Sequence, residues 1–364
     1  MKRILSTTMF LVACIATFCL FAGQTMAAPA AETAKQIQWR LASTWTEGNS
    51  LLDVDRAFAE RVKNYTGGNF IINVHPAGQL GSSSQVFDLA ANGIVEAACD
   101  WPGYWAGKNT AFDLLASTVD NFSFIDYYVW TYSAGGLEQY QYVYGKYGLV
   151  AFPIAFSPSE SGLRCIKDFK SLNDLKNAKV RISGKLQGYV AQRIGFTPVT
   201  INAAEIYESL QRGVIDAAEF AGPEADESLK MHEVAKYWMT PGWHQSAVTN
   251  CVMVNKKAWE ALPEEYRDAI ARAAKDSTAE WLYRKLWVDV QSSNRMIDKF
   301  GVTVNQLSEE DLRAISRYAA DGNKIMSDEN PDYKRVYESM QGYRKEIDRY
   351  RGILGRYGFG FLER

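Results

Sequence analysis

The segment "NAKVRISGK", residues 177–185, combines the pattern of a strand with a charge that is difficult to bury. Two apolar residues, Val180 and Ile182, alternate here with charged ones, which is the two-residue period of a half-buried strand. Segments with helical patterns flank it, so we expect the strand to lie in a sheet that is covered on both faces. An arginine in such a sheet is costly unless an anion meets it. The segment therefore predicts an anion beside Arg181.

The anion has two candidate sources. A guanidinium fork matches a carboxylate with two parallel charge-assisted hydrogen bonds, which explains an arginine here better than a lysine. The carboxylate belongs either to a bound ligand or to an acid of the protein itself. Glu219, at the end of another predicted strand, is either the partner of Arg181 or a ligand for a cation or a polar substrate. Glu160 and Arg164, in the turn-rich segment "SPSESGLRC", form either a surface pair or part of the site.

Two segments of 22 residues share one pattern. They are "SSSQVFDLAANGIVEAACDWPG" at 82–103 and "NAAEIYESLQRGVIDAAEFAGP" at 202–223. Each begins with a capping box, continues as a short amphipathic helix that ends at a glycine, and then has an apolar strand with one acid. Asp216 holds the place of Glu96, which favours a structural role for it. We infer one α/β unit that is used twice, once in each of two lobes.

The second unit extends into a strand–helix–strand–helix–strand order over residues 179–220, which is typical of a parallel sheet. Ligands of such sheets bind at the carboxyl ends of the strands, and Arg181 and Glu219 both fall near such ends. The fold class predicted is a two-lobed α/β protein with parallel-type sheets.

The C-terminal third is helical. Residues 263–300 begin with proline, end before glycine and contain no helix breaker, so they predict a helix long enough to span both lobes. The alternative is two helices with a bend near Ser277. Residues 301–364 predict further helices with a tyrosine stripe, which either pack on a lobe or pair with a second subunit.

The composition excludes several functions. The net charge is −2 and no run of Lys or Arg is present, which argues against a nucleic-acid partner. Histidine occurs at His75, His232 and His244, far apart in sequence, and no hydrolase, zinc or nucleotide motif is found. The sequence therefore predicts a protein that is not an enzyme.

Aromatic residues flank several predicted turns, where side chains often form the walls of binding sites. They are Trp45, Tyr104, Trp105, Phe220 and Trp243. Each is a candidate for a ligand contact, and core packing is the alternative for each.

The N-terminus has the pattern of an export signal: Lys2 and Arg3, an apolar run, and small residues up to a cleavage point after Ala27. Cys14 lies in "LVAC", which offers lipoprotein anchoring as the alternative. We therefore predict a periplasmic protein. Three cysteines, Cys99, Cys165 and Cys251, remain after cleavage, and they are either buried thiols or include one disulfide.

Four segments together resemble a known family. "KVRISG", "GVIDAAEFAGPEAD", "AKYWMTPGWHQ" and "VNKKAWEALPEEYRDAI", in this order and spacing, resemble the periplasmic substrate-binding subunits of TRAP transporters, the DctP family. The similarity is closest to the subgroup that binds 2-oxo acids and related monocarboxylates. It extends from "WRLASTW" at Trp39 to the tyrosine-rich tail.

The resemblance implies a clamshell receptor that captures a small carboxylate in the cleft between its lobes and delivers it to the membrane permease. The family's carboxylate-binding arginine falls on Arg181. Its cation-binding positions fall on Glu219, on the next aromatic residue, Phe220, and on Glu160. The last position is a glutamine in the subgroup, so two carboxylates here favour calcium over sodium, or no cation and a different polar ligand. Arg164 is then either the partner of Glu160 or a second anion contact.

The candidate substrate-binding residues are accordingly Arg181, Glu160, Arg164, Tyr104, Trp45, Phe220 and Trp243. The chain divides into a signal peptide (1–27), a first lobe (28–155, with parts of 250–300), a second lobe (156–249), a long helix (263–300) and C-terminal helices (301–364), which are also the candidate homodimer contact. The competing functions are a periplasmic receptor for amino acids or sugars that serves another transporter or a sensor, and a periplasmic enzyme that acts on carboxylates.

Overall fold

The computed structural model describes residues 36–119, 122–201 and 203–355. All elements below belong to the compact unit Ile37–Arg364. The predicted signal segment 1–27, with Cys14, lies outside the described residues. Among the described helices, none combines the length and the apolar character needed to cross a bilayer.

The first sheet has five strands in the order β2-β1-β3-β10-β4. Their bounds are β1 (Ile37–Ser43), β2 (Phe70–His75), β3 (Ala97–Asp100), β4 (Leu149–Ser157) and β10 (Val248–Asn255). β1 runs parallel to β2 and β3, whereas β10 runs antiparallel to β3 and β4.

The second sheet has six strands in the order β11-β9-β5-β8-β6-β7. Their bounds are β5 (Leu163–Cys165), β6 (Lys179–Arg181), β7 (Thr197–Val199), β8 (Ala217–Ala218), β9 (Tyr237–Thr240) and β11 (Thr303–Gln306). β6 is parallel to β7 and β8, and β5 is antiparallel to β8 and β9.

The predicted α/β class is confirmed, and the strands predicted to be parallel over residues 179–220 are parallel. Both sheets are mixed, however, because each also contains antiparallel pairs. The chain leaves the first sheet through β4 and enters the second through β5; it returns through β9 and β10. The outgoing and returning stretches lie side by side, as the pairs β4–β10 and β5–β9. Because the chain crosses in opposite directions, these pairs must be antiparallel.

The two copies of the repeated unit occupy equivalent places in the two sheets. The first comprises η1 (Ser83–Gln85), α3 (Val86–Ala91) and β3; the second comprises η4 (Ala203–Glu205), α8 (Ile206–Gln211) and β8. Glu96 accepts a hydrogen bond from the backbone N–H of Arg40 in β1 at 2.8 Å, and Asp216 accepts one from Lys179 in β6 at 2.9 Å. In each copy the acid therefore ties its strand to the neighbouring strand, which is a structural role.

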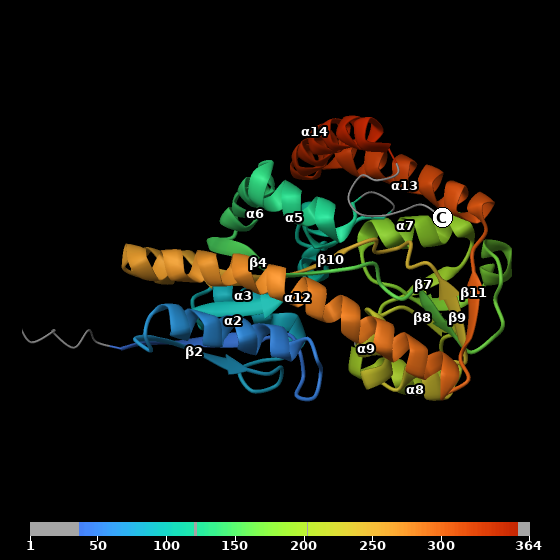
Figure 1. The fold of residues 1–364 in the computed structure, drawn as a ribbon, viewed down its shortest axis with the longest axis horizontal. Helices are drawn as coiled ribbons and strands as arrows, with labels where there is room; N and C mark the ends of the chain where they lie inside the picture. Colours follow the sequence, from blue (N-terminus) through green and yellow to red (C-terminus); the bar gives the residue numbers. More distant parts are fainter. Residues whose placement is uncertain (1–35, 120–121, 202, 356–364) are drawn as a thin grey trace, which may run out of the picture. The chain divides into compact units, whose positions relative to one another are not determined.

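A single helix, α12 (Glu264–Asp298), continues through Ser277 without a break. It packs against α2 (Leu52–Tyr65) and β4 and, further along, against α9 (Pro223–Ser228). Figure 1 shows this helix passing both sheets. The helix thus contributes side chains to the region where the sheets meet.

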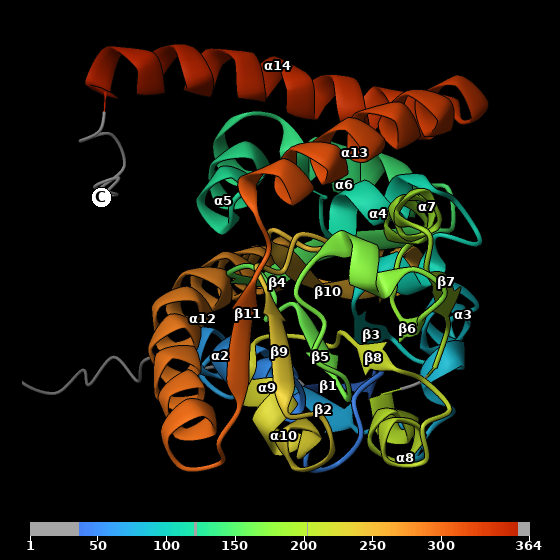
Figure 2. The same cartoon turned by 90° about the vertical axis from the view of Figure 1, so that its right-hand side faces the viewer.

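The C-terminal helices α13 (Glu309–Glu329) and α14 (Pro331–Leu354) pack on α7 (Lys185–Ile194), α4 (Ala111–Ala116) and α6 (Gly136–Gly145). Figure 2 shows α14 lying across α13 on the side of these helices. The remaining helices are η2 (Pro102–Trp105), α5 (Phe124–Ser133), η3 (Leu172–Leu175), α10 (Met231–Val234) and α11 (Lys256–Glu260).

One buried apolar cluster contains residues of both halves of the fold. Leu52 and Trp101 of the first half are grouped there with Ile206, Leu210 and Phe220 of the second. Burial of such side chains stabilises a fold by about 1.5–3 kcal/mol each. This cluster therefore holds the two halves together around the site described next. Cys99, Cys165 and Cys251 are buried free thiols.

Candidate functional site

A small cavity, called the inner cavity below, is lined by residues from both sheets and from α12. Its volume is about 40 Å³, which suits a ligand with few heavy atoms. Its aromatic walls are Trp45, Trp101, Tyr104 and Phe220, and its charged groups are Glu160, Arg181, Lys285 and Asp289.

Arg181 is the last residue of β6 and its side chain is buried. Its Nε donates to the carbonyl oxygen of Ile201 at 3.2 Å, and its Nη1 donates to the carbonyl oxygen of Glu219 at 2.8 Å. Nη1 also lies 2.8 Å from Oε2 of the Glu219 carboxylate. An acid of the protein therefore meets Arg181, which is one of the alternatives that the sequence left open. Nη2 makes no hydrogen bond to a described residue, so one nitrogen remains for a further anion.

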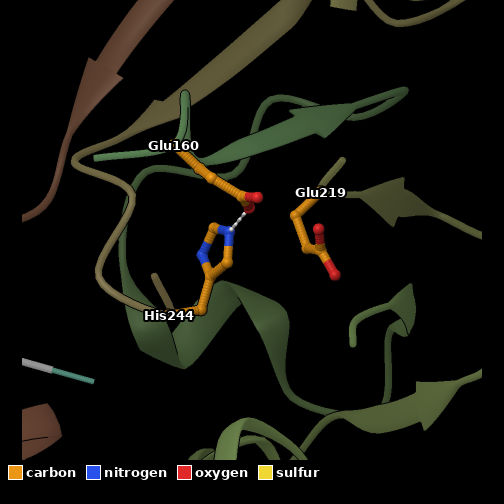
Figure 3. A group of neighbouring side chains, drawn as sticks. All are labelled: Glu160, Glu219 and His244. Atoms are coloured by element: carbon orange, nitrogen blue, oxygen red, sulfur yellow. Dashed lines mark hydrogen bonds and ion pairs between the residues drawn. The ribbon is translucent and has the colours of Figure 1, made fainter. Parts of the chain in front are cut away.

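Three buried side chains converge next to Arg181: Glu160, Glu219 and His244 (Figure 3). One ligand atom of each lies within 4.8 Å of the others. His244 Nε2 is 2.8 Å from the Glu160 carboxylate. The backbone N–H of Ser183 donates to Glu219. The three residues come from separate loops. These loops are brought together because each of them adjoins the end of a strand in the second sheet.

Burial sets the protonation of this cluster. Desolvation raises the pKa of Glu160 well above its usual range and raises that of Glu219 to about 7, although the charge of Arg181 opposes both shifts. Desolvation also lowers the pKa of His244 to about 4. Near pH 7 the imidazole is therefore neutral, and burial favours the protonated form of Glu160. The charge of Arg181 does not outweigh this burial, so a further positive charge beside the two acids would favour ionisation of both.

The two carboxylates fit a hard cation. Calcium binds oxygen at 2.3–2.6 Å, so two of its ligand oxygens lie at most about 5 Å apart, and the spacing in this cluster meets that limit. His244 is less suited as a calcium ligand, because calcium prefers oxygen. Its Nε2 already holds Glu160, so the imidazole orients that carboxylate.

Unpaired polar atoms are a second feature of the inner cavity. Four of the residues that line it have a buried side-chain N or O atom without a hydrogen-bond partner among the described residues. These atoms are Trp45 Nε1, Trp101 Nε1, Gln245 Oε1 and Asn250 Nδ2. Leaving one such group unpaired costs about 1–3 kcal/mol, and three of the four are donors. The cavity is therefore built to accept a polar ligand that is rich in acceptors.

The structure places five of the predicted substrate-binding residues in the wall of the inner cavity: Trp45, Tyr104, Glu160, Arg181 and Phe220. Glu219, predicted for the cation, lies directly beside Arg181.

Two predicted residues do not line the inner cavity. Arg164 is fully buried, with Nε 2.8 Å from Asp226 and its guanidinium over the ring of Trp238. It therefore pairs with Asp226 rather than with Glu160 or a ligand, because the β5–β9 pairing brings Trp238 opposite it. Trp243 packs edge-on against the ring of His244 and supports the cluster from outside the cavity.

Several residues of the site were not predicted from the amino-acid sequence. His244 was set aside because the histidines are far apart in sequence, yet it contacts Glu160 across 84 positions. Lys285 and Asp289 of α12 also line the cavity and pair with each other at 2.8 Å. Their i, i+4 spacing is that of an ordinary surface pair on a helix, so the sequence carries no signal that distinguishes them.

Comparison with known proteins agrees with this architecture. A family model described as "Bacterial extracellular solute-binding protein, family 7" matches residues 41–324. A monocarboxylate 2-oxoacid-binding periplasmic protein of Nostoc sp. is 30% identical over 311 residues, which cover 85% of each chain.

Solved structures are similar over most of the chain. A TRAP transporter solute-binding protein from Bordetella bronchiseptica, with copurified calcium and picolinate in its active site, has a TM-score of 0.83 and 29% identity; the match covers 87% of this chain and 94% of that one. A protein from Colwellia psychrerythraea with bound calcium and pyruvate has a TM-score of 0.83 and 25% identity, over 88% and 97% of the two chains. These relatives are receptors and not enzymes. The chain described here therefore belongs to family 7 of the bacterial extracellular solute-binding proteins, the DctP family of TRAP transporter receptors.

Proposed function

We propose that this receptor binds a 2-oxo acid or a related monocarboxylate in the inner cavity, with the carboxylate of the ligand on Arg181, and delivers it to a TRAP membrane permease. The observation that carries the proposal is the state of Arg181. Its guanidinium is buried in the cavity wall, and Nη2 remains without a hydrogen bond to a described residue. A buried positive group with an uncommitted donor favours a small anion.

The walls strengthen this preference. Trp45, Trp101 and Asn250 offer donors that lack partners, and the aromatic rings exclude water. A charge pair is stronger in such surroundings than in water. Because the wall residues come from both sheets, a ligand makes all of its contacts only while the two halves lie together around it. Binding would therefore favour the conformation in which the two halves meet.

We also propose that Glu160 and Glu219 hold a calcium ion, together with the backbone oxygen of Phe220. The two proteins with calcium described above support this ion. When both acids are ionised, these two acids, Arg181 and the ligand carboxylate together carry a net charge of −2. One divalent ion balances that charge. A bound calcium ion would supply a second positive contact for the oxygens of the ligand.

A thermal-shift screen of the mature protein tests the function. 2-Oxo acids are expected to raise the melting temperature by mass action, in calcium and without turnover. 2-Hydroxy acids, amino acids and sugars are the comparison sets. A shift with amino acids or sugars alone would overturn the proposal and favour a receptor for those ligands.

Calcium is tested separately in protein that has been treated with a chelator. Addition of calcium, but not of sodium or zinc, is expected to restore tight binding. Glu219→Gln should weaken the calcium response at least tenfold, whereas Glu47→Gln, at an exposed ion pair with Arg56, should not change it. Full binding of 2-oxo acids in the chelated protein would contradict the cation proposal while leaving the carboxylate site intact. Pairing of two copies through α14 stays a prediction.

A further inference from the structure

A second and larger cavity, called the outer cavity below, adjoins the inner cavity. Its volume is about 290 Å³. Trp45 and Tyr104 line both cavities, so these two side chains form the wall between them. The outer cavity therefore begins where the inner cavity ends.

The lining of the outer cavity is polar but carries no charged side chain. Besides aromatic residues and Ala203, it consists of Thr44, Thr46, Asn49, Ser83, Ser84 and Thr200. This differs from the inner cavity, whose wall holds two cations and two acids. A neutral polar wall offers hydrogen bonds to hydroxyl groups and offers nothing to compensate a buried charge.

Several of these polar groups are uncommitted. The hydroxyls of Thr46 and Thr200, which are exposed, and of Ser83, which is half-buried, make no hydrogen bond to a described residue and are open to a ligand, whereas Thr44 donates to the carbonyl oxygen of Ser83 at 3.3 Å. The ring nitrogen of Trp45, which is 4% exposed, is buried without a partner. A buried donor in the wall shared by both cavities indicates that a ligand atom completes it.

Tyr104 forms part of the wall between the two cavities. Its ring touches Trp101 edge-on, with ring centroids 5.2 Å apart, and lies 6.2 Å from the ring of Trp45. Its side chain is 40% exposed, and its hydroxyl makes no hydrogen bond to a described residue. The preceding residue, Gly103, lies directly against the ring of Trp101, where a Cβ would come within 2.1 Å of the ring, so only glycine fits there. The Tyr104 ring therefore lies between the rings that line the inner cavity and the polar wall of the outer cavity.

From these contacts we infer that the outer cavity is a second subsite, which receives the tail of a 2-oxo acid longer than the inner cavity can hold, and that this tail carries hydroxyl groups and no charge. The inference rests on the proposed function, because it places the carboxylate of the same ligand on Arg181. The tail would pass the Tyr104 ring and meet the hydroxyls of Thr46, Ser83 and Thr200. The preferred ligand class is therefore a polyhydroxylated 2-oxo monocarboxylate of about six carbons.

Calorimetric titration of the mature protein in calcium tests this with four ligands: pyruvate, 2-oxohexanoate, a six-carbon 2-oxo acid with hydroxyls on carbons 4 to 6, and 2-oxohexanedioate. The hydroxylated acid is expected to bind at least tenfold more tightly than 2-oxohexanoate and 2-oxohexanedioate. Equal or weaker binding of the hydroxylated acid, with pyruvate still bound, would overturn the subsite and leave the proposed function standing. Absence of binding by all four acids would overturn both.

Thr200→Val supplies the matched variant. It removes one hydroxyl from the outer cavity at nearly constant volume, and it should reduce the preference for the hydroxylated acid over 2-oxohexanoate about tenfold, the worth of one hydrogen bond. The control is Thr197→Val, in β7 and outside both cavities, which should leave that preference unchanged. An unchanged preference in Thr200→Val would contradict the inference.

Discussion

Replacing Arg181 by lysine keeps a positive charge in the inner cavity and removes the guanidinium fork. In the structure, Nε is used by the carbonyl oxygen of Ile201 and Nη1 by that of Glu219, so Nη2 is the nitrogen left for the ligand. A lysine has one nitrogen, which must serve either the Glu219 side or the ligand. The variant therefore loses about one charge-assisted hydrogen bond to the ligand, worth about 1.5–3 kcal/mol. This corresponds to 2-oxo acid binding that is about 10- to 150-fold weaker.

Isothermal titration of pyruvate in calcium measures this loss, with circular dichroism as the check on folding. Arg40→Lys is the control, because Arg40 lies on the first sheet, where it pairs with Glu96, and is about half exposed. Wild-type affinity in Arg181→Lys, within twofold, would refute the assignment of Nη2 to the ligand. Loss of affinity in Arg40→Lys as well would show that the effect is not local to the cavity.

Four further predictions concern stability. Gly162 has φ of +110°, and a Cβ there would lie 2.1 Å from a backbone oxygen of β9. Gly162→Ala should therefore lower the free energy of unfolding in urea by about 3 kcal/mol or more. Gly188 lies inside α7 with open space around it, so Gly188→Ala should instead raise the free energy of unfolding by about 0.5–1 kcal/mol. Arg164→Met leaves the buried Asp226 carboxylate unpaired and should destabilise by about 3–5 kcal/mol, and an unchanged urea midpoint would contradict this role. Burial raises the pKa of Asp113, which accepts the first N–H groups of α7, to about 7, so its ionisation is easier in the unfolded chain and stability should fall as pH rises from about 4 to 7. Asp113→Asn should make that fall shallower in urea titrations at several pH values, and identical slopes would rule the explanation out.

Local patterns predicted much of the fold. The repeated unit, the strand that ends at Arg181 and the uninterrupted helix after Pro263 were all read from short-range periodicity and capping residues, because these depend on neighbours within a few positions. Strand direction was not predictable in this way. An alternating pattern is the same in a parallel and an antiparallel pair, so the antiparallel direction of β10 against β4 could not be predicted from it.

The site was predictable where a residue type is unusual for its place. A buried arginine on a strand and aromatic residues beside turns pointed to Arg181, Trp45, Tyr104 and Phe220. Arg164 shows the limit of this approach, because it was predicted as a candidate site residue in a turn-rich segment, whereas it lies in β5 and is buried. Its partner, Asp226, lies 62 positions away, and packing on Trp238 brings the two together.

The amino-acid sequence was sufficient to establish two related α/β units, an anion beside Arg181 and membership of a receptor family, since each depends on local spacing. The three-dimensional fold was needed to learn that Glu219 already shares Arg181, that His244 holds Glu160, and that two cavities of different polarity meet at Tyr104. These facts depend on which distant segments become neighbours. That choice is made by the packing of the whole chain, in which many weak contacts are summed, and no short stretch of sequence carries it.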